Sequence, residues 1–80
     1  MLEILQHEKK AVGIKQTTKA LKQEIAKVLY VAEDADAFLI EQLIEIARSK
    51  HIEVIKVESM KKLGKACGID VGAAAAAVLK

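Results

Sequence analysis

Continuous apolar segments rich in β-branched residues indicate the strands of this chain. Residues 28–32 read Val-Leu-Tyr-Val-Ala, and isoleucine or valine fills most of residues 52–57. Such runs are typical of strands that are covered on both faces of a sheet. A shorter apolar stretch around residues 11–14 predicts a further, brief strand. The pattern therefore predicts a sheet with other elements packed against both of its sides.

Helical spacing of apolar residues separates these strands. Good helix formers fill residues 16–24, with Ala20 and Leu21 available to the core. A second helix follows Asp34 or Asp36, either of which can cap it, and its apolar stripe comprises Ala35, Leu39, Ile40, Leu43, Ile44, Ile46 and Ala47. Ser59 can cap a third helix, which ends at Gly68 and turns Met60, Leu63, Ala66 and Cys67 inward. A further short helix is predicted over residues 2–10.

The alanine-rich end of the chain, residues 71–79, fits two structures. Alanine is the best helix former, so propensity favours a helix. The segment is short, however, and ends in Val78-Leu79. A strand enclosed between two closely spaced helical layers would also require small side chains. The residues alone leave strand and helix open.

Alternating strands and helices predict an α/β fold, a three-layer α/β/α sandwich. Eighty residues, 52% of them hydrophobic, suffice for one core, so we expect a single domain over residues 1–80. That size is too small for a deep active site with a cofactor. The chain start lacks the pattern of a signal peptide, and the longest apolar run is too short for a bilayer. We therefore expect a cytoplasmic protein without a membrane partner.

Glycine and lysine gather in the same two segments, since all four glycines lie within residues 13–19 or 59–72. Residues 9–27 have a net charge of +5 and residues 59–80 of +3, whereas residues 33–58 have −4. A solvated helix face explains any one lysine cluster. Two clusters that coincide with the glycines favour one positive surface for a polyanion such as nucleic acid, with the acidic middle segment facing elsewhere.

No pattern of catalytic residues stands out. Cys67 is the only cysteine, which excludes an intramolecular disulfide and a multi-cysteine metal site, and we expect it to be a buried thiol. Glu33, Asp34 and Asp36 form an acidic cluster that capping of the following helix explains. No glycine-rich phosphate loop is present. We therefore expect neither an enzyme nor a metal-binding or cofactor-binding protein.

Aromatic residues are nearly absent, since Tyr30 and Phe38 are the only two and both occupy core-like positions. The chain thus lacks the rings on which single-stranded bases stack, so a nucleic-acid partner would be read by its folded shape. A helix N-terminus with Lys15, Gln16 and Lys19 offers amides to phosphates and side chains to guanine edges. In RNA those edges are accessible only where an internal loop or kink opens the major groove.

Four ordered motifs are similar to those of a known family. They are Gly-Ile-Lys-Gln-Thr-Thr-Lys-Ala at 13–20, Val-Ala-Glu-Asp-Ala-Asp at 31–36, Val-Glu-Ser-Met-Lys-Lys-Leu-Gly at 57–64 and Ala-Cys-Gly-Ile-Asp-Val at 66–71. From Ala11 onward the chain resembles the L-seven-Ae ribosomal protein family, and more closely its small bacterial, YbxF-like branch. The resemblance implies a kink-turn RNA-binding protein whose α/β/α sandwich surrounds a mixed four-stranded sheet, with the tail as a strand.

The resemblance also implies binding residues. In the family, a Gly-x-Asn-Glu-x-x-Lys segment approaches the sheared G·A pairs of the kinked loop, and the loop after the last helix packs against the kink. By position these roles fall on Gly13, Lys15, Gln16 and Lys19, and on Ile69, Asp70 and Val71. Lys15-Gln16 stands where archaeal and eukaryotic members have Asn-Glu, so the carboxylate acceptor of that glutamate is missing.

We therefore expect a monomeric, non-enzymatic protein of the L-seven-Ae type that stabilises kink-turn RNA, ribosomal or in a riboswitch, and does not bind DNA. A wider electrostatic field would come from Lys22, Lys61, Lys62 and Lys65. One alternative is a protein-binding module whose basic face meets an acidic partner in a ribosomal or RNA-processing complex. The other is a small enzyme that depends on Cys67 or Asp34.

Overall fold

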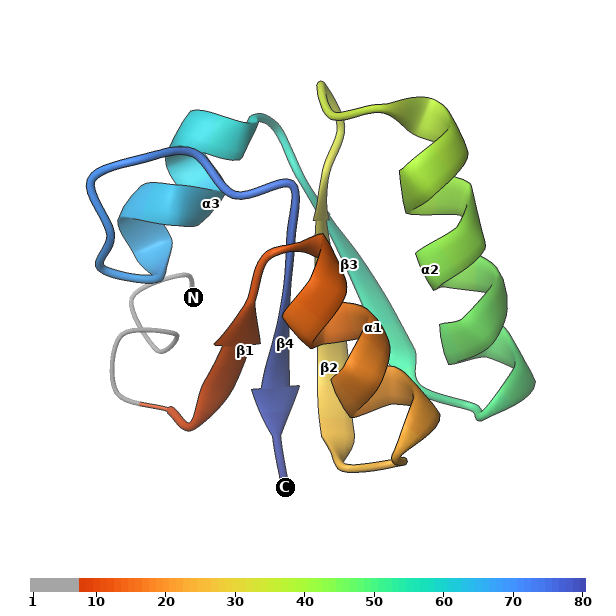
Figure 1. The fold of residues 1–80 in the computed structure, drawn as a ribbon. Coiled ribbons are helices and arrows are strands. Elements are labelled where there is room, and N and C mark those ends of the chain that lie inside the picture. Colours follow the sequence, from red (N-terminus) through yellow and green to blue (C-terminus); the bar gives the residue numbers. More distant parts are fainter. Residues whose placement is uncertain (1–7) are drawn as a thin grey trace.

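The computed structural model describes residues 8–80, which form a mixed four-stranded sheet with three helices (Figure 1). The strands are β1 (Lys10–Val12), β2 (Ala26–Ala32), β3 (Glu53–Val57) and β4 (Ala75–Leu79), and the helices are α1 (Ile14–Lys22), α2 (Ala37–Ser49) and α3 (Met60–Ala66). Their order across the sheet is β1-β4-β2-β3. β4 runs antiparallel to both neighbours, whereas β2 and β3 are parallel.

Two hydrophobic cores, one on each face of the sheet, hold three layers together. Leu21, Leu29 and Leu43 belong to the core under α1 and α2, and all three are fully buried. Leu63 and Tyr30 belong to the core under α3, on the opposite face. The predicted α/β/α sandwich is therefore confirmed. Within residues 8–80, no helix is long and apolar enough to cross a membrane.

The alanine-rich tail forms the strand β4, which lies inside the sheet between β1 and β2. Ala75 and Ala77 face the core under α1 and α2, and Ala76 faces the core under α3. All three are fully buried. Because helices pack against both faces of this strand, small side chains are required there, and packing overrides the helix propensity of alanine.

The other strand predictions need two corrections. β3 is an edge strand and Val57 is its only buried residue, so the prediction of a buried strand is wrong for residues 53–56, although Val54 packs against one core and Ile55 against the other. A β-branched run reflects strand propensity and does not determine where in the sheet the strand lies. The first strand ends at Val12, because Gly13, with a φ of 95°, turns the chain into α1 two residues earlier than predicted.

Three apolar side chains expected in the core are exposed instead. Phe38 is 68% exposed on the first turn of α2, and Leu39 and Met60 are about a third exposed. The apolar stripe of α2 is wider than the face that contacts the sheet, which uses Ile40, Leu43 and Ala47. The helix predicted over residues 2–10 falls mainly outside the described residues, although Lys10 itself lies in β1.

Replacing Ala77 by leucine should lower the free energy of unfolding by about 1–3 kcal/mol, because the added carbons would force α1 away from β4. Chemical denaturation measures the change. As a control, Ala37→Leu makes the same substitution at an exposed position and should change stability by less than about 0.5 kcal/mol. If both proteins were as stable as the parent, the close approach of α1 to β4 would be contradicted.

Candidate nucleic-acid interface

The start of α1 and the loop after α3 meet at one end of the sheet. The backbone N–H of Gly13 donates to the carbonyl of Ala75 (2.8 Å), and that of Ala32 donates to the carbonyl of Ala74 (2.9 Å). Residues 74 and 75 lead from the loop after α3 into β4. Figure 1 shows the starts of the three helices and this loop towards the same, upper end of the sheet. The start of the first basic segment therefore contacts the chain three residues after the end of the second, at Ala75.

The start of α1 presents uncapped amide groups. Gly13 has φ 95° and ψ 160°, a conformation that side chains disfavour, and it directs the chain from β1 into the helix. Within the described residues, no side chain caps this helix and no acidic residue occupies its first turn. The first N–H groups of the helix therefore remain available at the positive end of its dipole.

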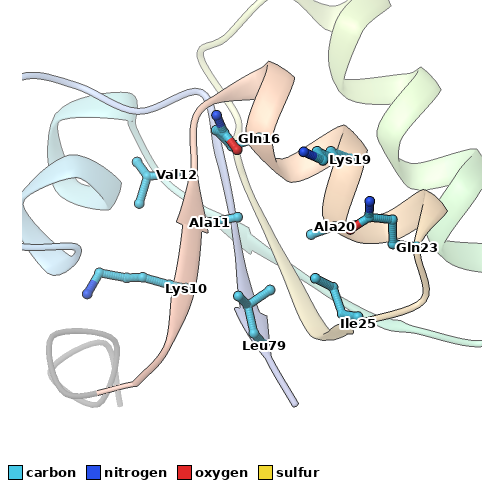
Figure 2. A pocket seen from close by; sticks show the side chains of 9 residues that line it. All are labelled: Lys10, Ala11, Val12, Gln16, Lys19, Ala20, Gln23, Ile25 and Leu79. Carbon is cyan, nitrogen blue, oxygen red and sulfur yellow. The ribbon is translucent and has the colours of Figure 1, made fainter.

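The predicted residues of α1 are all exposed but spread along the helix. Lys15 lies in the first turn, and Gln16 and Lys19 line a groove of about 370 Å³ between α1 and β1 (Figure 2). Lys22 lies in the last turn and borders a different hollow, between α1 and α2. At 1.5 Å per residue, about 10 Å of helix separates Lys22 from Lys15. Lys22 is therefore remote from the start of α1.

The loop after α3 is held against the helix by its backbone. Gly68, at φ 80°, donates to the carbonyl of Lys65 (3.0 Å), and Ile69 donates to that of Gly64 (3.0 Å), which together form a Schellman motif. The chain then passes so close to α3 that a Cβ on Gly64 would overlap the carbonyl oxygen of Val71. This fixed path leaves the side chains of Ile69, Asp70 and Val71 exposed at the surface.

The lysines of α3 lie on the other face of the sheet from α1. Lys61, Lys62 and Lys65 are all exposed. Lys62 is paired with Glu58, whose carboxylate oxygen is 2.7 Å from the ammonium group. The hydrogen bond from Lys62 lowers the pKa of Glu58, so the carboxylate stays charged and offsets part of the positive field of Lys62. Lys61 and Lys65 therefore contribute more to that field.

The prediction that the acidic segment faces elsewhere is wrong for Glu33, Asp34 and Asp36. These residues lie between β2 and α2, at the same end of the sheet as Gly13. Asp36 caps α2, because one carboxylate oxygen accepts from the amides of Phe38 (2.9 Å) and Leu39 (3.2 Å). Two of the three carboxylates are thus held by amide groups at helix starts, since Asp34 accepts from the first amide of α3.

The role of Asp34 could not be found from the sequence. Its carboxylate oxygen lies 2.7 Å from the amide nitrogen of Met60, which is 26 residues away in the chain. Asp34 therefore joins the β2–α2 loop to the start of α3, alongside the cap from Ser59 to Lys62 (3.1 Å). The only signal was the presence of two aspartates, Asp34 and Asp36, before a helix that needs one cap.

Comparison with known proteins identifies the family. Residues 2–80 match the family described as ribosomal protein L7Ae/L30e/S12e/Gadd45. The chain belongs to this family. The RNA-binding protein YbxF of Geobacillus stearothermophilus is 51% identical to it over 78 residues, which are 98% of this chain and 95% of that protein. The predicted resemblance to the family and to its YbxF-like branch is therefore confirmed.

Two further comparisons extend this result within the L7Ae/L30e/S12e/Gadd45 family and its fold. The large ribosomal subunit protein eL8 of Halobacterium salinarum is 44% identical over 68 residues, which cover 84% of this chain and 57% of that protein. The structure of the Giardia lamblia 15.5kD RNA binding protein matches with a TM-score of 0.90 at 22% identity, over 99% of this chain and 70% of that one. At that identity, the structural match shows a common fold.

The protein is not an enzyme, because its family and the relatives that match it are a non-enzymatic class of binding proteins. Cys67 is buried, as predicted. Burial raises the pKa of its thiol, although Lys10 opposes the shift, so the nucleophilic thiolate is disfavoured at neutral pH. Among residues 8–80, no group of three or more histidine, cysteine or acidic side chains could hold a metal ion.

Replacing Gly64 by alanine should lower the free energy of unfolding by about 1–3 kcal/mol, because the new methyl group overlaps the Val71 carbonyl. This cost exceeds the gain of about 1 kcal/mol that alanine brings to a helix interior. Thermal and urea unfolding measure the difference. Lys65→Ala, an exposed change in the same helix, is the control, and equal stability of the two variants would contradict the close approach.

Replacing Asp34 by alanine should cost about 0.5–2 kcal/mol of stability, because the amide of Met60 loses its acceptor. Asp34→Asn retains an oxygen acceptor in the same place and should lose less. Urea denaturation of both variants checks the order. Glu33→Ala removes an exposed neighbouring carboxylate and should change stability by less than about 0.5 kcal/mol. A loss as large as that of Asp34→Ala would mean that general charge, and not the hydrogen bond, matters.

Proposed function

We propose that this protein binds kink-turn RNA and holds it in the bent form. One observation carries the proposal: the hydrogen bond from Gly13 to Ala75 holds the uncapped start of α1 next to the segment through which the loop after α3 enters β4. The start of α1 and the loop after α3 are thus held at a fixed distance and orientation. This arrangement fits an RNA in which an opened groove and a sharp bend also have a fixed distance and orientation. Binding the bent form in preference to the extended one shifts the RNA towards it.

The two surfaces would divide the contacts. Lys15 and the first amides of α1 suit phosphates, and Gln16 and Lys19 suit the edges of bases in the opened major groove. The amide of Gln16 both donates and accepts, so it can replace the acceptor of a glutamate without its charge. Ile69 and Val71, which are exposed and apolar, suit packing against the bend, with Asp70 between them.

The relatives support the RNA partner. Those at about 51% identity are named RNA-binding proteins, and eL8 of Halobacterium salinarum is a ribosomal protein. We further propose that the partner is a cytoplasmic RNA, either ribosomal or regulatory, and that the protein binds it as a monomer. The lysines of α3 and Lys22 lie away from the start of α1, so we assign them to the surrounding electrostatic field.

Replacing Lys19 by alanine should weaken binding to a kink-turn by about 1–3 kcal/mol if its ammonium group meets a base edge. Dissociation constants at one fixed salt concentration should be measured for a kink-turn, for the same RNA with its G·A pairs disrupted, and for a straight duplex of equal length. The loss should be largest for the kink-turn.

Lys27→Ala is the matched control, because Lys27 is an exposed lysine at the opposite end of β2. It should weaken binding to all three RNAs slightly and to a similar extent. If the unaltered protein bound the duplex as tightly as the kink-turn, kink-turn recognition would be refuted. The protein-binding module would then be the better interpretation.

A further inference from the structure

The groove between α1 and β1 continues beyond the residues assigned to base contacts. It begins at Gln16 and Lys19 and runs along α1 to Gln23, which follows the helix as its C-cap (Figure 2). Gln16 and Gln23 are seven residues apart, close to two helical turns, so both lie on the same side of α1. The groove thus offers an amide at each end and an ammonium group between them.

The lining of this groove suits a sugar–phosphate chain. Its apolar part consists of small or aliphatic side chains, namely Ala11, Ala20, Ile25 and Leu79. Among residues 8–80, no acidic residue lines it, whereas the hollow beside β2 and α2 includes Glu33 and Glu41, and the hollow between α1 and α2 includes Glu45. In this described part of the chain, it is therefore the one of these three hollows without a carboxylate that would repel a phosphate.

Lys10 also borders the groove, but its side chain is not directed into it. Figure 2 shows the Lys10 side chain turned away from α1, on the same side of β1 as Val12. Val12 packs against the core under α3, and the charge of Lys10 affects the thiol of Cys67 in that core. The polar contacts inside the groove therefore come from Gln16, Lys19 and Gln23.

We propose that this groove binds the ribose–phosphate backbone of the RNA stem that adjoins the kink, with Gln23 as a further contact residue. The inference rests on the proposed function, because the stem enters the groove from the base contacts at Gln16 and Lys19. Ribose packs over the aliphatic floor, and a phosphate oxygen of the stem accepts from the side-chain amide of Gln23. The contact spans about 10 Å of helix, so it requires a stem that extends past the G·A pairs.

Three substitutions of Gln23, to a neutral, an acidic and a basic residue, test the proposal. Gln23→Ala should weaken kink-turn binding about three- to tenfold, the worth of one hydrogen bond. Gln23→Glu has the same shape but repels phosphate, so its loss should be larger and should grow as salt is lowered. Gln23→Lys should bind more tightly, with a slope of log Kd against log salt that is steeper by about one. Lys10→Ala, which removes a charge at the groove border, should change affinity less than Gln23→Glu.

Shortening the RNA stem provides the second arm of the experiment. Each variant is measured with kink-turns whose stem beyond the G·A pairs is removed one base pair at a time. The differences among the Gln23 variants should vanish once the stem no longer reaches the groove, while the loss from Lys19→Ala persists. Gln23 is exposed, and its cap hydrogen bonds use only backbone atoms, so the variants should fold alike, which circular dichroism verifies.

The outcomes separate this inference from the function on which it rests. If Lys19→Ala weakens binding but all Gln23 variants match the parent, the part of the groove beyond Lys19 does not bind RNA and the proposed function stands. If the Gln23 differences are independent of stem length, the assignment of the groove to the stem is overturned. If the parent protein does not prefer a kink-turn to a duplex, both the proposed function and this inference fail.

Discussion

The burial of β4 between two helical layers is the constraint on which the rest of the structure depends. β4 pairs with both β1 and β2, so the sheet is continuous only because this last segment of the chain enters it. Its alanines let α1 approach one face and α3 the other. The carbonyls of Ala74 and Ala75, at its entry, accept from Ala32 and Gly13 and so fix the ends of β2 and β1. The candidate interface is therefore fully formed only after β4 has paired with β1 and β2.

Backbone groups, more than side chains, shape the candidate interface. The positive φ of Gly13 sets the start of α1, and the Schellman motif at Gly68 reverses the chain after α3. A backbone hydrogen bond from the N–H of Ala73 to the carbonyl of Met60 (3.0 Å) closes the loop. From these segments, the side chains of Lys15, Gln16, Ile69 and Val71 are exposed at the surface. This end of the sheet carries acidic as well as basic side chains. The carboxylates of Asp34 and Asp36 are hydrogen-bonded to helix amides, which offset part of their negative charge. The electrostatic field of the candidate interface thus depends on these hydrogen bonds as well as on the net charge.

The sequence was sufficient for the elements whose signals are local. The helix stripe at Ile40, Leu43 and Ala47, the cap at Ser59 and the turn at Gly68 each depend on residues within one or two helical turns, and the structure has them as predicted. The tail was ambiguous because the packing that decides it comes from helices far away in the chain. The resemblance to the family resolved that ambiguity in favour of the strand.

Local sequence patterns could not predict contacts between residues far apart in the chain. The hydrogen bond from the amide of Met60 to Asp34 depends on two loops that only the folded sheet brings together. The exposure of Phe38 depends on which part of a wide apolar stripe the sheet covers. Among the site residues, the local sequence did not show that Lys22 would border a different hollow from Lys19. Gln23 belongs to no sequence motif. Only the groove between α1 and β1, which Gln23 lines together with Gln16 and Lys19, connects it with the candidate site.

The close approach of Gly64 to Val71 has a consequence for protein engineering. The path of the loop is set by the missing side chain of Gly64, by the turn at Gly68 and by backbone bonds. None of these depends on the side chains at positions 69, 70 and 71, which are exposed. These three positions can therefore be randomised in a library while the scaffold stays unchanged. The loop would then serve as a variable region, with α1 supplying a constant anchor, for selecting binders to RNA bends of other sequences.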